Sequence, residues 1–147
     1  NASFLQSTAY PLRGLSDRLA KLGAKSVLVA LDSCFYGAGG RSVLPQGARP
    51  LVAKVAEGLP VGRGVTLLAA ASGEEMSSTI DEARHGLFTY FMLKGLNGDA
   101  KDSSGKVTLR GLYEYLKPKV QDEARLQNRE QTPALFGEQT DIGLVQP

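Results

Sequence analysis

Residues 26–37 read SVLVALDSCFYG, and this stretch indicates the fold class. Residues 26–31 form an apolar, β-branched run, which is typical of a parallel strand buried on both faces. The run ends in Asp32-Ser33-Cys34, and a glycine-rich turn follows directly. A thiol at this position is expected at the rim of a sheet, where neighbouring backbone N–H groups can bind a developing oxyanion. A buried structural thiol is the alternative for Cys34.

Helix and strand patterns alternate around this run. Residues 9–22 space their leucines 3, 4 and 3 apart with charged residues between them, which predicts an amphipathic helix that ends at Gly23. Further elements are predicted at residues 65–71 (strand), 84–96 (helix ended by Asn97-Gly98), 109–120 (helix capped by Thr108) and 134–136 (strand). This alternation favours a three-layer α/β sheet, with a ligand site beyond the carboxyl ends of its strands.

Two features interrupt the pattern. Pro118 lies within the apolar stripe of the predicted helix 109–120 and is expected to kink or break it. Residues 37–64 are rich in Gly, Pro and Arg, with room for a short element near 51–55. Connections of this length in compact domains are usually functional or processed.

The composition is that of an ordinary globular chain, with 42% hydrophobic residues, 22% charged residues and a net charge of +2. Like charges do not cluster, so we expect no nucleic-acid partner. No apolar run reaches the roughly 18 residues needed to span a bilayer, so we expect no membrane partner. A single cysteine allows neither an internal disulfide nor a zinc ribbon, and we expect no metal.

We expect a cytoplasmic location. Because the chain begins with Asn1 rather than Met, we expect it to be an internal part of a longer protein.

Residues 27–42, VLVALDSCFYGAGGRS, are similar to the active-site segment of metacaspases and bacterial caspase-like cysteine peptidases. In that family a strand ends in Asp-Ser/Ala-Cys, followed by an aromatic residue or His, a small residue and Gly. Other parts of the family follow in the same order: a core strand with its substrate loop, the small-subunit helix, and a closing helix and strand. These parts resemble LLAAASGEE (67–75), HGLFTYFMLKGL (85–96), LYEYLKPKV (112–120) and QTPALFG (131–137). The resemblance covers roughly residues 4–137.

The resemblance implies a three-layer caspase-like sandwich with a mostly parallel central sheet, of which residues 1–147 are the C-terminal portion. Residues 1–60 would end the large-subunit-like part, and residues 61–147 would form the small-subunit-like part. The implied activity is that of a cysteine endopeptidase that acts on polypeptides and needs no cofactor. Cys34 would be its nucleophile.

The catalytic base is expected outside this chain, although His85 is present. In the family the His-Gly-Leu-Phe-Thr-Tyr helix is structural, and the base precedes the nucleophile by about 50 residues. Only 33 residues precede Cys34, and none is histidine. A thiolate at neutral pH requires an imidazole to take its proton. We therefore expect an N-terminal fragment of the same protease, which carries the histidine, as a partner.

The resemblance also implies the substrate-binding residues, which are Asp32, Ser33, Ser72 and Ser77. Asp32 would line the pocket for a substrate Arg or Lys, because a carboxylate accepts two parallel hydrogen bonds from a guanidinium. The alternative for Asp32 is a solvated or helix-capping acid. The loop that begins at Ser72 would run beside the substrate backbone, and its alternative is a plain surface turn.

Other interpretations remain open. Cleavage after Asp would require a cationic pocket, which Arg41, Arg49 or Arg63 could supply. Tyr36 stands where the family has a small residue, which favours an inactive caspase-like scaffold. A nucleotide- or signal-binding domain is disfavoured because no phosphate-binding glycine motif follows a strand. Residues 99–107 hint at a calcium loop but lack oxygen side chains at key ligand positions, so we expect a plain loop and no calcium dependence.

Overall fold

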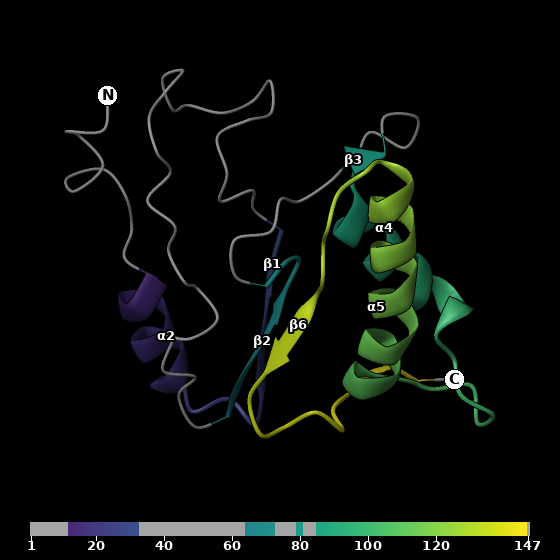
Figure 1. The fold of residues 1–147 in the computed structure, drawn as a ribbon. Helices are drawn as coiled ribbons and strands as arrows, with labels where there is room; N and C mark the ends of the chain where they lie inside the picture. Colours follow the sequence, from purple (N-terminus) through teal and green to yellow (C-terminus); the bar gives the residue numbers. More distant parts are fainter. Residues whose placement is uncertain (1–11, 33–63, 73–78, 81–84, 147) are drawn as a thin grey trace, which may run out of the picture.

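A computed structural model of the chain describes residues 12–32, 64–72, 79–80 and 85–146, and Figure 1 shows the arrangement of its elements. In chain order these are α2 (Leu12–Ala20), β1 (Val27–Leu31), β2 (Val65–Ala69), β3 (Thr79–Ile80), β4 (His85–Gly86), α4 (Leu87–Lys94), the π-helical turn η2 (Gly95–Asp99), β5 (Val107–Thr108), α5 (Leu109–Leu126), β6 (Ala134–Phe136) and β7 (Gly143–Val145). Helix α2 lies on one side of the sheet β1-β2-β6, and α4 and α5 lie on the other (Figure 1). The chain is a mixed α/β protein, which confirms the predicted class.

The central sheet contains one parallel and one antiparallel pair. Strand β1 pairs with β2 in parallel, from Val27 opposite Val65 to Leu31 opposite Ala69. Strand β6 runs antiparallel to β2, with Ala134 opposite Ala69. The described sheet is therefore mixed, whereas we expected it to be mostly parallel. The reason is the short connection 127–133, which brings the chain from the end of α5 to the carboxyl ends of β1 and β2, so that the next strand must run back down the sheet.

The two parallel strands differ in burial. All five residues of β2 are buried, as expected for a strand covered on both faces. Strand β1 is only half-buried and its Ala30 is exposed, in contrast to the full burial predicted for residues 26–31. Within the described part of the chain, β1 is an edge strand, so only β2 has a strand neighbour on each side.

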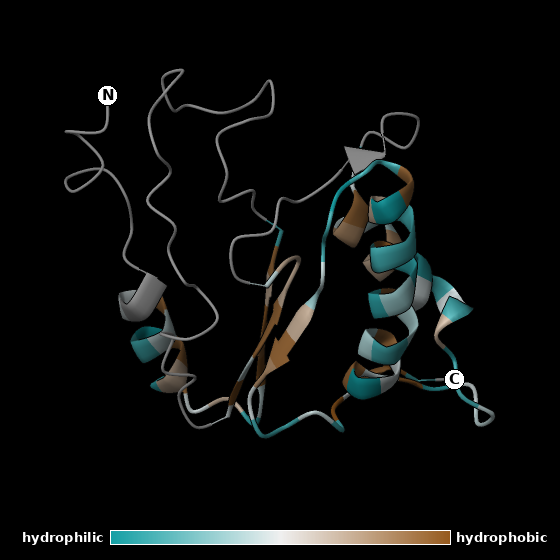
Figure 2. Ribbon diagram, in the orientation of Figure 1, coloured by the Kyte–Doolittle hydropathy of each residue, from teal (hydrophilic) through white to brown (hydrophobic). Residues whose placement is uncertain are grey.

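The core lies between the sheet and the helices α4 and α5, and Figure 2 shows the apolar residues concentrated on the three strands and on the helices that face them. Four members of the predicted stripe on α5 are buried, namely Leu109, Leu112, Leu116 and Val120, while Tyr113 is only partly buried. Burying each leucine contributes roughly 1.5–3 kcal/mol. The complete cluster consists of Leu68, Ala70, Leu87, Phe88, Val107, Leu109, Leu112, Leu116, Val120 and Ala124.

Helix α5 starts as predicted but does not break at Pro118. The Thr108 hydroxyl accepts a hydrogen bond from the Gly111 N–H at 3.1 Å, which confirms Thr108 as the N-cap. The helix then continues from Leu109 to Leu126, through Pro118. Proline removes one hydrogen bond to the carbonyl of Glu114, but both residues are exposed, so water can reach that carbonyl.

Helix α4 is shorter than the predicted helix 84–96. Its start is delayed to Leu87 because His85 and Gly86 pair with β3 as a strand. At the other end the helix continues as η2, where Gly98 has a φ of 130° that only glycine adopts easily. The predicted end at Asn97-Gly98 is thereby confirmed.

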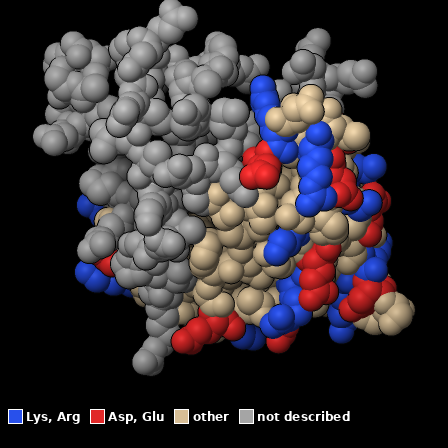
Figure 3. Space-filling view, in the orientation of Figure 1, with Lys and Arg blue, Asp and Glu red and all other residues tan. Residues whose placement is uncertain are grey.

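The described helices include none with both the length and the apolar character that crossing a bilayer requires. The longest, α5, has 18 residues and displays charges of both signs on its outer face (Figure 3). One exposed pair on it joins Arg125 and Asp122 at 3.1 Å. Exposed pairs of this kind contribute only about 0–1 kcal/mol each.

Gly137 is expected to be the least replaceable glycine of the central sheet. Its φ is 121°, and a Cβ atom there would lie 2.9 Å from the Val65 carbonyl oxygen and 3.0 Å from the Thr66 Cα. Gly137→Ala is therefore expected to lower the free energy of unfolding by about 2 kcal/mol or more. The matched control is Gly14→Ala in helix α2, where no atom lies within 4 Å of the added carbon and a gain of about 0.5–1 kcal/mol is expected. Urea denaturation measures both variants, and an equal loss of unfolding free energy in Gly137→Ala and Gly14→Ala would contradict this prediction.

Candidate functional site at the carboxyl edge of the sheet

The candidate site lies at the carboxyl edge of the sheet, which is its upper edge in Figure 1. Because β1 and β2 are parallel, both end there, and Asp32 and Ala70 follow them. Strand β6 starts at the same edge, since it is antiparallel to β2. Of the predicted site residues, Asp32 and Ser72 lie in the described part of the chain, whereas Ser33, Cys34 and Ser77 lie outside it.

Asp32 is bonded to the start of helix α4. Its Oδ2 accepts a hydrogen bond from the Thr89 backbone N–H at 3.3 Å and another from the Thr89 hydroxyl at 2.5 Å. Thr89 is the third residue of α4, and its N–H has no partner within the helix. The N-cap residue is Gly86, which has no side chain to supply the bond. Asp32, which directly follows β1, therefore caps α4 from a position 57 residues earlier in the sequence.

Gly86 makes this contact possible because it has no Cβ atom. A Cβ built there would collide with the Asp32 carboxylate and would lie 3.1 Å from its Cγ and 3.2 Å from its Oδ1. The carboxylate thus rests directly against the backbone of β4. Asp32, Gly86 and Thr89 together form what we call the Asp32 seat.

The second carboxylate oxygen, Oδ1, has a different environment. No hydrogen bond or ion pair joins it to any of the described residues, and the Asp32 side chain is exposed. The interpretation of Asp32 as a helix-capping acid is therefore confirmed, and capping occupies only one of its two oxygens. The other oxygen can still bind a cation.

Ser72 follows Ala70, whose backbone N–H and carbonyl are both hydrogen-bonded. The Ala70 N–H donates to the Leu31 carbonyl at 2.9 Å, and its own carbonyl accepts from the Gln131 side-chain amide at 2.9 Å. Gln131 is 1% exposed, so this bond is shielded from water. Ser72, two residues further on, is half-buried at the same edge as Asp32.

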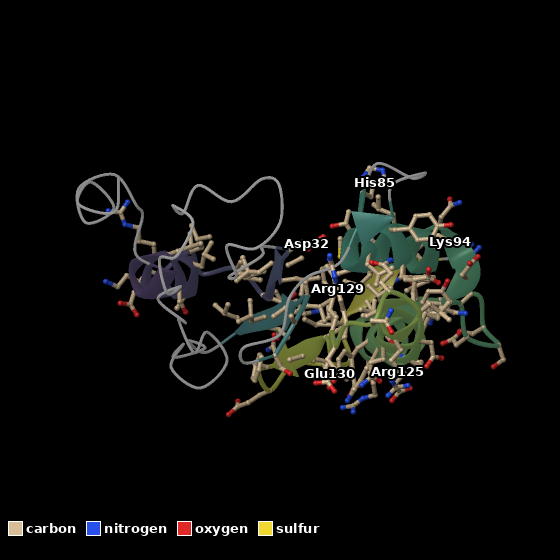
Figure 4. All side chains as sticks on the ribbon, turned by 45° about the horizontal axis from the view of Figure 1, so that its top comes forward. Asp32, His85, Lys94, Arg125, Arg129 and Glu130 are labelled. Carbon is tan, nitrogen blue, oxygen red and sulfur yellow. The ribbon has the colours of Figure 1, made fainter. Side chains whose placement is uncertain are left out.

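His85 and Arg129 lie on two other segments near this edge, and Figure 4 labels both together with Asp32, with His85 drawn apart from the other two. His85 is exposed and lies in β4 next to Gly86. Arg129 is exposed and lies two residues before Gln131, whose side chain bonds Ala70. Asn128, with a φ of 54°, turns the chain toward the edge after α5. The single histidine of the chain thus lies next to Gly86, whose backbone packs against the Asp32 carboxylate.

Sequence reasoning missed Gly86, Thr89 and Gln131 as parts of this edge. The available signal was weak. A glycine N-cap supplies no side-chain acceptor, so the first N–H groups of the helix bond water or a side chain from elsewhere, and any of several acids in the sequence could have been that partner. Gln131 is followed by Thr132 and Pro133, which suggested only an entry to a strand. Neither pattern identifies its partner across a sequence distance of about 60 residues.

In the segment 99–107, Asp99 ends η2 and Val107 begins β5, and the loop between them is closed by its own side chains. The Asp102 Oδ1 accepts hydrogen bonds from the Ser104 N–H at 2.8 Å, the Ser104 hydroxyl at 2.7 Å and the Lys106 N–H at 3.1 Å. The carboxylate thus serves the turn itself. Among the residues that the structure describes, no group of three or more histidine, cysteine or acidic side chains is arranged to hold a metal ion.

The Asp102 loop predicts a pH dependence of stability. The hydrogen bond from the Ser104 hydroxyl, followed by those from the Lys106 and Ser104 N–H groups, lowers the pKa of Asp102 from 3.8. A lowered pKa in the folded state stabilises the fold above the unfolded pKa, and this contribution is lost as the pH falls through the folded value. The difference in unfolding free energy between the wild type and Asp102→Ala is therefore expected to be constant from pH 7 to 5 and to shrink below about pH 4. A difference that grows in acid would contradict this assignment.

Comparisons of the chain with protein-family models, with curated proteins and with solved structures found no match.

Proposed function

We propose that the chain is part of a caspase-like cysteine endopeptidase of the metacaspase type, which cleaves polypeptides after Arg or Lys. The observation that carries this proposal is the Asp32 seat. A carboxylate is held at the carboxyl edge of a sheet, and one of its oxygens has no partner among the described residues. It stands two residues before the only thiol of the sequence. Ligand sites of α/β sheets lie at this edge. The sequence resemblance of residues 27–42 adds the chemistry of the nucleophile.

The proposed reaction is acyl transfer through a thioester. The Cys34 thiolate attacks the scissile carbonyl carbon, and the negative charge that develops on the oxygen is bound by backbone N–H groups, including that of Cys34. The C–N bond then breaks while an imidazolium protonates the leaving amine. Water, deprotonated by the same imidazole, hydrolyses the thioester and releases the acid. Asp32 binds the side chain of the residue before the cut.

The proposal places the imidazole on an N-terminal fragment of the same protease, which is the partner of this chain. In this proposal the sheet is part of a caspase-like sandwich, with residues 1–60 ending its large-subunit-like part and residues 61–147 forming its small-subunit-like part. Ser33, Ser72 and Ser77 bind the substrate backbone. The protease acts in the cytoplasm and requires no cofactor. His85 keeps a structural role, for which its strand pairing with β3 is the support.

The proposal is tested with the full-length protein and a panel of fluorogenic peptides that differ only in the residue before the bond: Arg, Lys, Asp or Leu. Cleavage after Arg and Lys, with little after Asp or Leu, is the expected result. Preferential cleavage after Asp would overturn the pocket assignment and would favour the cationic alternatives Arg41, Arg49 and Arg63.

An inactive caspase-like scaffold is the second candidate, and one observation favours it. The two hydrogen bonds that Asp32 accepts from Thr89 give this carboxylate a structural role that needs no substrate. The two candidates differ in the reactivity of the thiol. A peptidyl acyloxymethyl ketone with Arg beside its warhead is expected to add its mass to Cys34 in an enzyme. An unlabelled protein that also cleaves no member of the panel would identify the scaffold.

A further inference from the structure

We infer that the site binds Lys and Arg side chains through a single oxygen of Asp32. Because Thr89 occupies the other oxygen, the site is expected to distinguish only weakly between Arg and Lys substrates. This inference rests on the proposed function, because it concerns the cation that Asp32 binds there. It also changes the expected chemistry: the two parallel hydrogen bonds of a guanidinium are not available to this carboxylate.

The argument begins with the lone pairs of the carboxylate. Each carboxylate oxygen accepts about two hydrogen bonds. Both positions on Oδ2 are occupied, one by the Thr89 N–H and one by the Thr89 hydroxyl. A side-on guanidinium pair requires one acceptor position on each oxygen. Among the described residues only Oδ1 has no hydrogen-bond partner. A guanidinium bound there cannot make its second parallel hydrogen bond, whereas an ammonium group, which acts as a point charge, binds one oxygen equally well.

The Asp32 seat is also too well anchored for the carboxylate to exchange its oxygens easily. Thr89 follows Leu87 and Phe88, which are both 0% exposed and belong to the core. The start of α4 is therefore fixed by packing. Gly86 brings the backbone against the face of the carboxylate, where even a methyl group would collide with it. A substrate that competed for Oδ2 would have to leave the Thr89 N–H without its acceptor.

Thr89→Val tests the inference, because valine has nearly the shape of threonine and retains the backbone N–H but not the hydroxyl. The measurement is the ratio of kcat/KM for matched Arg and Lys peptides with the full-length protein. The wild-type ratio is expected to lie within about threefold of one. Thr89→Val frees one position on Oδ2 and is expected to raise the Arg:Lys ratio about tenfold, the value of one charged hydrogen bond. Thr89→Ser keeps the hydroxyl and is expected to retain the wild-type ratio.

A second readout is independent of catalysis. Benzamidine carries an amidinium group, which can donate two parallel hydrogen bonds, whereas benzylamine carries a single ammonium group. Calorimetry on the Cys34→Ala protein measures the Kd of each compound. Adding Thr89→Val is expected to tighten benzamidine relative to benzylamine by about tenfold. If Thr89→Val does not fold, Thr89→Ala replaces it with the same expectation.

The outcomes separate this inference from the proposed function. Cleavage after basic residues with an Arg:Lys ratio that Thr89→Val leaves unchanged would overturn the inference alone. A wild-type protein that strongly prefers Arg over Lys would also overturn it. A protein that binds neither probe and cleaves after neither residue would overturn the proposed function, and the inference with it.

Discussion

Asp32→Ala is expected to lower kcat/KM for Arg and Lys substrates by roughly 30- to several-thousand-fold. Removing one partner of a charge pair that becomes desolvated in a complex costs about 2–5 kcal/mol, and each 1.36 kcal/mol corresponds to about a factor of ten in rate. Oδ1, which has no partner among the described residues, is the atom that makes the pair. The thiol is expected to remain reactive toward an acyloxymethyl ketone that carries Leu beside the warhead.

Asp32→Asn is the matched control, because it separates charge from capping. The amide oxygen of asparagine can still accept the two Thr89 hydrogen bonds, so the start of α4 retains its cap. The Ala variant loses this cap and is expected to be less stable by about 1 kcal/mol. Both variants are expected to lose basic specificity, but only Ala to lose stability. An Ala variant that cleaves Arg peptides as well as the wild type would show that Asp32 only caps the helix.

Cys34→Ala is expected to abolish peptide cleavage, with a loss of at least about 1,000-fold in kcat. The reason is that no second thiol exists in the chain to replace it. The melting temperature is expected to change by no more than a few degrees, since the substitution removes a single sulfur atom. Initial rates on an Arg peptide, together with a thermal melt of the full-length protein, measure both quantities.

Cys34→Ser provides the control for this prediction. Serine keeps a hydroxyl of similar size, but it is a far weaker nucleophile at neutral pH, so its rate is expected to fall nearly as far as that of the Ala variant. Neither variant is expected to react with the acyloxymethyl ketone. Undiminished proteolysis by the Ala variant would eliminate Cys34 as the nucleophile.

The periodicity of the sequence determined the main helices and the strands of the central sheet. The helices at residues 12–20 and 109–126 and the strands at 27–31, 65–69 and 134–136 all overlap predicted segments, although the second helix continues past its predicted end at residue 120. Both helices carry leucines on one face, and the strands at 27–31 and 65–69 are apolar runs that contain β-branched residues, so burial of these patterns requires the predicted structure. The three-residue strand Ala134–Phe136 has no such pattern of its own. Thr108 was recognisable as a cap because its partner, the Gly111 N–H, lies only three residues away.

Only the tertiary structure decided the direction of β6, the short pairs β3–β4 and β5–β7, and the partners of Asp32. Strands of two or three residues are too short to show an alternating pattern. The direction of β6 depends on where α5 ends in space, which no local pattern records. The sequence by itself marked Asp32 as a notable acid. Its bond to Thr89 arises because packing of Leu87 and Phe88 in the core brings an uncapped helix start to the end of β1, and a contact across 57 residues leaves no trace in the neighbouring sequence.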